Sequence, residues 1–175
     1  PPGPYRELPR GAVVFAIGAL DSYLAELSAE FLVAKLESKS SSSEVREVLK
    51  KIRSELPTLA LELCLIEPKS DRIQKMKDVV VDHFHKNVSN HGSKAVSSIA
   101  SLIGSRPPDI WASIEAKGHT RPVVELEKWT DIRHRIVHQG KAETVRRQHA
   151  RDAIAFINDI VEVVDAATLK ALTEL

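Results

Sequence analysis

PVVELEKWTDIRHRIVHQG, residues 122–140, carries the pattern that decides the fold of this chain. Its apolar residues recur at spacings of three and four, which is the period of an amphipathic helix. Pro122 suits the first position of such a helix, and Gly140 suits the position just after its end. The same period recurs over residues 10–36, 44–66, 71–88, 93–103, 109–114 and 143–172. No segment alternates with a period of two, so the sequence predicts an all-α fold of about five to seven helices.

The size and composition are those of one globular domain. The chain has 175 residues, of which 43% are hydrophobic and 28% charged, enough to bury a core without disulfides. Residues 1–9, PPGPYRELP, predict an extended arm, and residues 10–175 are expected to form the single domain. The net charge of +1 gives no overall attraction to nucleic acid, so any such binding depends on a local basic patch.

The cysteine content and the hydropathy of the sequence indicate the cellular compartment in which the protein is expected. Cys64 is the only cysteine, so the chain forms no internal disulfide, which is typical of the reducing cytoplasm. Its apolar neighbours predict that Cys64 is a buried, inert thiol. No apolar run approaches the roughly 18 residues that span a bilayer. We therefore expect a cytoplasmic protein without a membrane partner.

The end of the 122–140 helix carries the candidate catalytic residues. Arg133 and His138 have four residues between them, and His134 directly follows the arginine. An imidazole titrates near neutrality, so His138 can take a proton from a ribose 2′-hydroxyl, and the resulting alkoxide attacks the adjacent phosphate. A guanidinium is always charged and binds phosphate in a bidentate way, so Arg133 suits the negative charge that develops. These residues indicate metal-free cleavage of RNA.

Helical geometry limits how these side chains meet. His134, His138 and Asp131 share one face, where Asp131 can orient an imidazole, but Arg133 lies roughly 140° around the helix from His138. Convergence needs a long reach by the arginine, a distorted helix end, or an arginine from a second subunit. The competing interpretation is ordinary surface charge, with Asp131 and Arg135 as an exposed ion pair and histidine favoured by the helix dipole.

Further basic residues lie close to the motif in the sequence. We expect RNA contacts from Arg135, Lys141, Arg146 and Arg147, with Arg151 adding to the same charge. These cations would hold the RNA backbone in a salt-dependent way, with little dependence on base sequence. The alternative is a solvated basic face without a function.

Two tryptophans and two histidines are further candidates for site residues in the sequence. Trp111 and Trp129 lie among apolar residues at helical spacing, so we expect them in the core or in an interface. His83 and His85 suggest a metal site, but they point to different sides of a helix, and no cysteine or carboxylate has a convincing ligand spacing. No glycine-rich phosphate loop is present. We expect neither a metal nor a cofactor.

RHRIVH, residues 133–138, resembles the R-x4-6-H motif of the HEPN superfamily, including the polar residue that follows the arginine. The segment ALDSYLAEL, residues 19–27, is similar to the first helix of the RiboL-PSP-HEPN branch, where an acidic and an aromatic residue recur. The order of helices agrees as well, from a long first helix to a motif helix ending in His-x-Gly and a long last helix. The resemblance extends over about residues 10–172 and is most specific at its two ends.

The resemblance implies a helical bundle that pairs as a homodimer, with two copies of the motif in a shared cleft. It implies a metal-independent endoribonuclease in which Arg133 and His138 are the catalytic pair, His134 supports them, and Asp21 and Tyr23 line or brace the cleft. Such enzymes serve as toxins, phage-defence or stress-response effectors, and some are held inactive by an antitoxin protein. Other members bind a nucleotide, RNA or a partner protein without catalysis, which is the alternative function.

Overall fold

The structure, a computed structural model, describes residues 7–38, 50, 64–66, 69–87, 92–139 and 144–174, without the side chains of residues 36 and 83–87. These residues form helices and no strand. The six helices are α1 (Glu7–Glu37), α4 (Lys69–Asn87), α5 (Ser93–Leu102), α6 (Pro107–Glu115), α7 (Pro122–Gln139) and α8 (Arg147–Thr173). The predicted all-α bundle is therefore confirmed over the described part of the chain.

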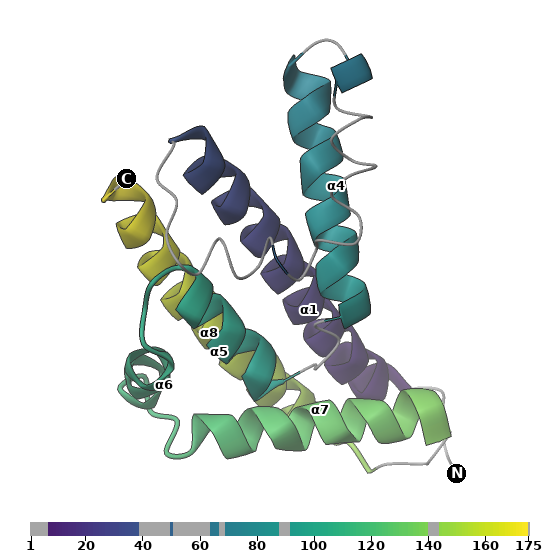
Figure 1. Ribbon diagram of the computed structural model, residues 1–175. Coiled ribbons are helices and arrows are strands. Elements are labelled where there is room, and N and C mark those ends of the chain that lie inside the picture. The colour runs from purple at the N-terminus through teal and green to yellow at the C-terminus, as the bar shows by residue number, and fades with distance from the viewer. Residues whose placement is uncertain are drawn as a thin grey trace.

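The long helix α1 is central to the bundle and contacts α4, α5, α7 and α8. Figure 1 shows α1 and α8 side by side and running in the same direction, with α4 on the other side of α1. The hydroxyl of Tyr23 on α1 donates to Oδ1 of Asp165 on α8, which fixes the register of this parallel pair. α7 crosses the end of the bundle at which α1 begins, so the C-terminal end of α7 lies beside the first turns of α1 (Figure 1).

One hydrophobic core joins the described helices. Its largest fully buried side chains are Val13, Ile17, Leu20, Phe31 and Leu32 of α1, Ile99 of α5, Ile114 of α6, Leu126 of α7, and Phe156 and Ile160 of α8. α4 adds Val80 to the same cluster. Trp111 and Trp129 are buried as predicted. The buried hydroxyl of Thr168 donates to the carbonyl of Val164 at 2.8 Å, so it is satisfied within its own helix.

The composition of α1 is apolar for much of its length. By length and composition alone, its segment Glu7–Lys35 qualifies as a candidate membrane span, which corrects the expectation that no run is apolar enough. Packing explains this composition, because a helix with four neighbours needs apolar residues around most of its circumference. Core helices of soluble proteins meet the same criterion. Leu8 and Phe15 nevertheless remain exposed on α1.

Two helix starts differ from their predicted positions. α1 begins at Glu7, so residues 7–9, which were expected in an extended arm, are helical. Pro9 is compatible with this start because it lies in the first turn, where a backbone N–H has no partner within the helix. α8 begins at Arg147 rather than near Glu143, because Arg146 has an extended backbone conformation.

Two described residues at the end of the apolar run that contains Cys64 are not part of the core. Cys64 is exposed, which contradicts the predicted buried thiol, and its neighbour Leu65 is exposed as well. The apolar pattern of this run therefore does not report burial at these two positions. The helix predicted over residues 44–56, and its apolar continuation after Pro57 to residue 66, lie outside the described residues apart from residues 50 and 64–66.

Contacts at the start of α5 hold α7 in place. Glu127 of α7 accepts hydrogen bonds from both the backbone N–H of Ser93, at 3.1 Å, and the Ser93 hydroxyl. A carboxylate of α7 thus caps the first turn of α5, where the helix dipole favours negative charge. Gly92 has a φ of 114°, and a side chain there would come within 3.0 Å of Oε1 of Glu127. The positive φ favours glycine at this position, and a larger residue would also need the Glu127 side chain to shift.

Candidate active site

The motif helix turns Arg133 toward the bundle. Arg133 lies seven residues after Leu126 and four after Trp129, which are both buried, so it continues the inner face of α7. Its side chain is half-buried, and its Nε atom is enclosed without a hydrogen-bond partner among the described residues. None of the ion pairs found in the described part of the chain includes Arg133. A partly desolvated cation without a counter-ion is unfavourable for stability, and such groups are common at functional sites.

The two histidines of the motif lie on a different face of α7 from the arginine. His134 and His138 are exposed, and their ring centroids are 4.9 Å apart with 44° between the ring planes. The helix stays α-helical to Gln139, so no distorted end brings Arg133 to His138. On a regular helix these two residues diverge by roughly 140°. Of the routes to convergence, a long reach by the arginine and a second subunit remain.

The carboxylate of Asp131 binds an arginine rather than a histidine. It accepts a hydrogen bond from Nη1 of Arg135 one turn later, which is the pair that the surface-charge interpretation expects. This contact occupies both the residue predicted to orient an imidazole and one residue predicted to contact RNA. An exposed pair of this kind contributes at most about 1 kcal/mol. A role for either residue at the site therefore requires this weak pair to open.

Asp21 and Tyr23 lie in the middle of α1, where Tyr23 faces α8. Burial, and then the hydrogen bond to Asp165, raises the pKa of Tyr23 far above its ordinary value, so the phenol stays protonated. The observed role of Tyr23 is to brace α1 against α8. Asp21 is half-buried on the same stretch of α1. A contribution of either residue to a catalytic cleft stays a prediction.

Two of the four residues predicted to contact RNA, Arg146 and Arg147, lie at the start of α8, whereas Arg135 lies on α7. Arg146 and Arg147 are exposed there, and Arg151 is exposed one turn later. None of these three guanidinium groups pairs with a carboxylate of the described residues. Lys141 lies outside the described residues. The start of α8 is therefore a strongly positive surface.

A charged cluster at the other end of α7 was not predicted. His119, in the loop before α7, has Nδ1 at 3.2 Å from Oε2 of Glu125 and Nε2 at 3.0 Å from Oδ2 of Asp159 on α8. Lys117 donates to Oδ1 of Asp159 at 3.0 Å and to Oε2 of Glu162 at 2.6 Å. An imidazole and an ammonium group of one loop thus face three carboxylates. The spacing of Asp159 and Glu162 on one face of α8 was the available signal, but the sequence does not show which loop they meet.

This cluster at the start of α7 has the character of a structural clamp. Hydrogen bonds from His119, and then from Lys117, hold the pKa of the Asp159 carboxyl below its usual range. The His119 ring also packs on Phe156 of the core, with ring centroids 4.7 Å apart. Because its charges are mutually paired and it rests on the core, the cluster fixes the loop before α7 to α8.

Groups that could hold a metal ion are absent from the described residues, in which no three His, Cys, Asp or Glu side chains gather closely enough. His83 and His85 belong to α4, but their side chains lie outside the described part of the structure. The motif itself offers a guanidinium and two imidazoles. These groups suit charge stabilisation and proton transfer rather than metal ligation as a set.

The fold and the site define an all-α domain whose penultimate helix carries an arginine–histidine motif at its C-terminal end. The sequence model of the RiboL-PSP-HEPN family matches residues 1–169. The chain belongs to this family and is a HEPN-type domain. The match includes the middle of the chain, where the resemblance rested on few residues. No curated protein and no solved structure matches the chain.

Proposed function

We propose that this protein is a metal-independent endoribonuclease that leaves 2′,3′-cyclic phosphate ends on RNA. Its membership of a HEPN family, in which RNases are common, supports the class of activity. The observation that carries the proposal is the arrangement at the C-terminal end of α7. There, a half-buried Arg133 without a counter-ion among the described residues lies near two exposed imidazoles 4.9 Å apart.

The residues of the motif supply each step of such a reaction. His138 takes the proton of the ribose 2′-hydroxyl, and the 2′-oxygen forms a bond to the adjacent phosphorus. The bond from phosphorus to the 5′-oxygen breaks, and that oxygen takes a proton from His134 in its protonated form. Arg133 pairs with the non-bridging oxygens, on which negative charge grows in the transition state. The products are a 2′,3′-cyclic phosphate and a 5′-hydroxyl.

We assign the complete site to a homodimer. The motif helix is regular to Gln139, and Arg133 and His138 diverge around it. Pairing two copies of α7 around a twofold axis would place Arg133 of one protomer opposite the partner's His138. The divergence within one chain is the observation that supports this assignment.

The direct test is cleavage of a labelled single-stranded RNA in the presence of EDTA. We expect wild-type protein to cleave it and to leave cyclic phosphate ends, and His138→Ala to be inactive while keeping the wild-type circular dichroism spectrum. A DNA oligonucleotide of the same sequence lacks the attacking 2′-hydroxyl and serves as the control substrate. Cleavage by a clean His138→Ala preparation would remove the assignment. RNA binding without cleavage by the wild type would leave the non-catalytic alternative.

Mixed dimers test whether the site is shared between subunits. Arg133→Ala and His138→Ala are each expected to be inactive, but a dimer that contains one of each keeps one intact site if the two residues come from different protomers. Half of the dimers in an equimolar mixture are mixed, so we expect about a quarter of wild-type activity to return. A site contained within one chain predicts no recovery. A protein that is strictly monomeric by light scattering would also exclude the shared site.

We further propose that the enzyme acts in the cytoplasm as a toxin, antiviral or stress-response effector. The single cysteine and the family support this setting. An antitoxin protein is the expected partner if expression of the domain is toxic. Growth arrest that requires His138 would support this role, and harmless expression of an active enzyme would contradict it.

A further inference from the structure

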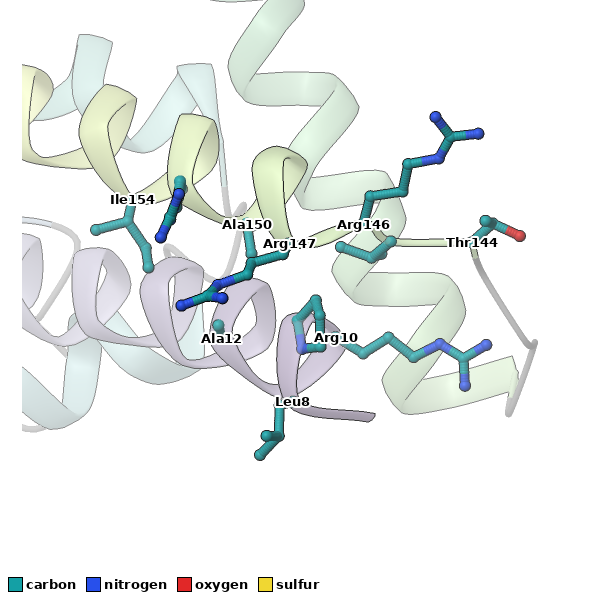
Figure 2. Close-up of a pocket in the computed structure, with 11 residues that line it drawn as sticks. Leu8, Arg10, Ala12, Thr144, Arg146, Arg147, Ala150 and Ile154 are labelled. Atoms are coloured by element: carbon teal, nitrogen blue, oxygen red, sulfur yellow. The ribbon is translucent and has the colours of Figure 1, made fainter. Parts of the chain in front are cut away.

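A groove runs along the start of α8 and the first turns of α1. It has a volume of about 1040 Å³, and residues on both helices and on the segment that leads into α8 line it. The parallel packing of α1 and α8 creates this groove, because it brings the N-terminal ends of both helices to the same end of the bundle. Figure 2 shows Arg147 lying along the gap between the two helices, while Arg10 and Arg146 extend outward at the end of the groove.

The groove carries concentrated positive charge. Arg10, Arg146, Arg147 and Arg151 line it, and no acidic residue does so within the described parts of the chain. Arg10 donates to Glu7 at 2.7 Å, so its charge is partly balanced. Arg146, Arg147 and Arg151 have no carboxylate partner among the residues that the structure describes.

The position of these arginines on α8 is unfavourable for the helix itself. The N-terminal end of a helix carries partial positive charge, so acidic residues stabilise it and basic residues do not. The first turn of α8 contains no acidic residue, and arginines occupy both its start and the groove beside it. A bound anion would relieve this accumulation of charge, since guanidinium groups and free backbone N–H groups both bind phosphate.

The groove also has apolar surface between its cations. Leu8 and Ile154 line it and are exposed, at 66% and 40% of their full accessible surface. A paired duplex offers mainly phosphates to such a surface, whereas an unpaired strand offers phosphates together with the faces of its bases. The mixture of arginines and aliphatic side chains therefore favours a single strand.

The groove is linked to the motif by a short segment of chain. Thr144, which lines the groove, follows His138 by six residues, so their Cα atoms are at most about 22 Å apart. A strand that reaches the motif histidines thus has the groove within a few nucleotides.

We propose that this groove binds the sugar–phosphate backbone of single-stranded RNA next to the cleavage site, with Arg10 of α1 joining Arg146, Arg147 and Arg151 as a phosphate contact. The proposal rests on the proposed nuclease function for its choice of ligand. It assigns α1 a part in RNA binding and makes that binding largely independent of base sequence, because the contacts are to phosphates.

The test measures binding rather than cleavage. The probe is a fluorescent single-stranded 2′-O-methyl oligoribonucleotide, which lacks the attacking hydroxyl, and its anisotropy is recorded with wild-type protein at several salt concentrations. For the double variant Arg147→Ala/Arg151→Ala we expect binding weakened about tenfold or more, and a slope of log Kd against log salt that is smaller by about 1.4, or about 0.7 for each lost phosphate contact. Arg121→Ala removes an exposed arginine at the other end of α7 and is expected to bind as the wild type does.

Several outcomes would overturn the proposal. Unchanged affinity and salt slope in the double variant would show that the groove does not hold the probe. Equal weakening by Arg121→Ala would indicate general charge attraction. If a duplex of the same sequence binds as tightly as the single-stranded probe, the groove is not specific for a single strand. If adenosine monophosphate binds as tightly as the probe and displaces it, the groove is a mononucleotide site. If the wild type fails to cleave RNA but the double variant still loses binding, the nuclease function fails while the groove assignment stands.

Discussion

The charged side chains at the two ends of α7 differ in how far they are paired with opposite charges. At its N-terminal end, His119 and Lys117 each face two carboxylates, and the cluster ties the preceding loop to α8. At its C-terminal end, Arg133 has no counter-ion among the described residues, and His134 and His138 are exposed. Both ends are rich in basic and titratable groups. Arg135 at the C-terminal end pairs with Asp131, but Arg133 finds no carboxylate among the described residues.

This difference separates a structural role from a functional one. A charge that is paired inside the protein contributes to stability and has little left to offer a ligand. An unpaired cation contributes nothing favourable to folding, and its charge remains available to a bound phosphate. The comparison therefore predicts that substitutions at the two ends of α7 affect different properties.

The largest expected effect is on catalysis. His138→Ala removes the proposed general base, so we expect the rate of RNA cleavage to fall by about 10²–10⁴-fold. The thermal midpoint should stay near that of the wild type, because the side chain is exposed. Single-turnover cleavage and thermal unfolding monitored by circular dichroism measure the two quantities. A variant that cleaves at the wild-type rate would show that the C-terminal end of α7 is not catalytic.

The second-largest expected effect is a loss of stability when the His119 cluster at the N-terminal end of α7 is changed. Asp159→Asn weakens the contacts to both His119 and Lys117, and we expect the free energy of unfolding to fall by about 1 kcal/mol. Urea unfolding measures this loss. Asp109→Asn, which weakens the exposed bidentate pair with Arg106, is the matched control and should cost less, because this pair is more exposed than the contacts of Asp159. A loss of cleavage in folded Asp159→Asn protein would contradict the separation of the two ends.

The pH dependence of that stability follows from the lowered pKa of Asp159. A carboxyl whose pKa is lower in the folded protein than its ordinary value of 3.8 stabilises the fold above that pH, and the contribution disappears as the pH falls through the folded pKa. The difference in unfolding free energy between wild type and Asp159→Asn should therefore shrink as the pH falls below about 4. Urea unfolding at a series of pH values in this acidic range tests this. A difference that grows as the pH falls below about 4 would have the wrong sign.

The smallest effect is expected at the start of α8. Arg147→Glu replaces an unpaired cation near the positive end of the helix with an anion, so we expect a gain of about 0.3–1 kcal/mol in the free energy of unfolding. The same variant should bind single-stranded RNA more weakly. Calorimetry and the binding assay report the two changes. A variant that is less stable than wild type would indicate that Arg147 has a structural role.

The helices were predictable because their apolar spacing repeats along the sequence. The bounds of α7 follow from Pro122 and the residues before Gly140, and the observed helix ends at Gln139. The starts of α1 and α8 were less accurate because local conformation decides them. Proline fits the first turn of α1, and the extended Arg146 delays the start of α8. Periodicity does not report either feature.

The site was predictable only where its residues are close in the sequence. Arg133, His134 and His138 could be identified together because they share one helix. The His119 cluster and the contribution of Arg10 to the groove depend on which helices pack against each other. The parallel packing of α1 and α8 brings Arg10 to the arginines of α8, and sequence spacing carries no information about that packing.

The most direct test of the central claim compares two histidines of one protein. His138→Ala and His119→Ala each remove an imidazole, one from each end of α7, and both the cleavage rate and the thermal midpoint are measured for each variant. We predict that His138→Ala loses cleavage and keeps the wild-type midpoint, whereas His119→Ala lowers the midpoint and cleaves normally at temperatures where it is folded. Wild-type cleavage by His138→Ala, or loss of cleavage in folded His119→Ala protein, would contradict the division of roles along α7.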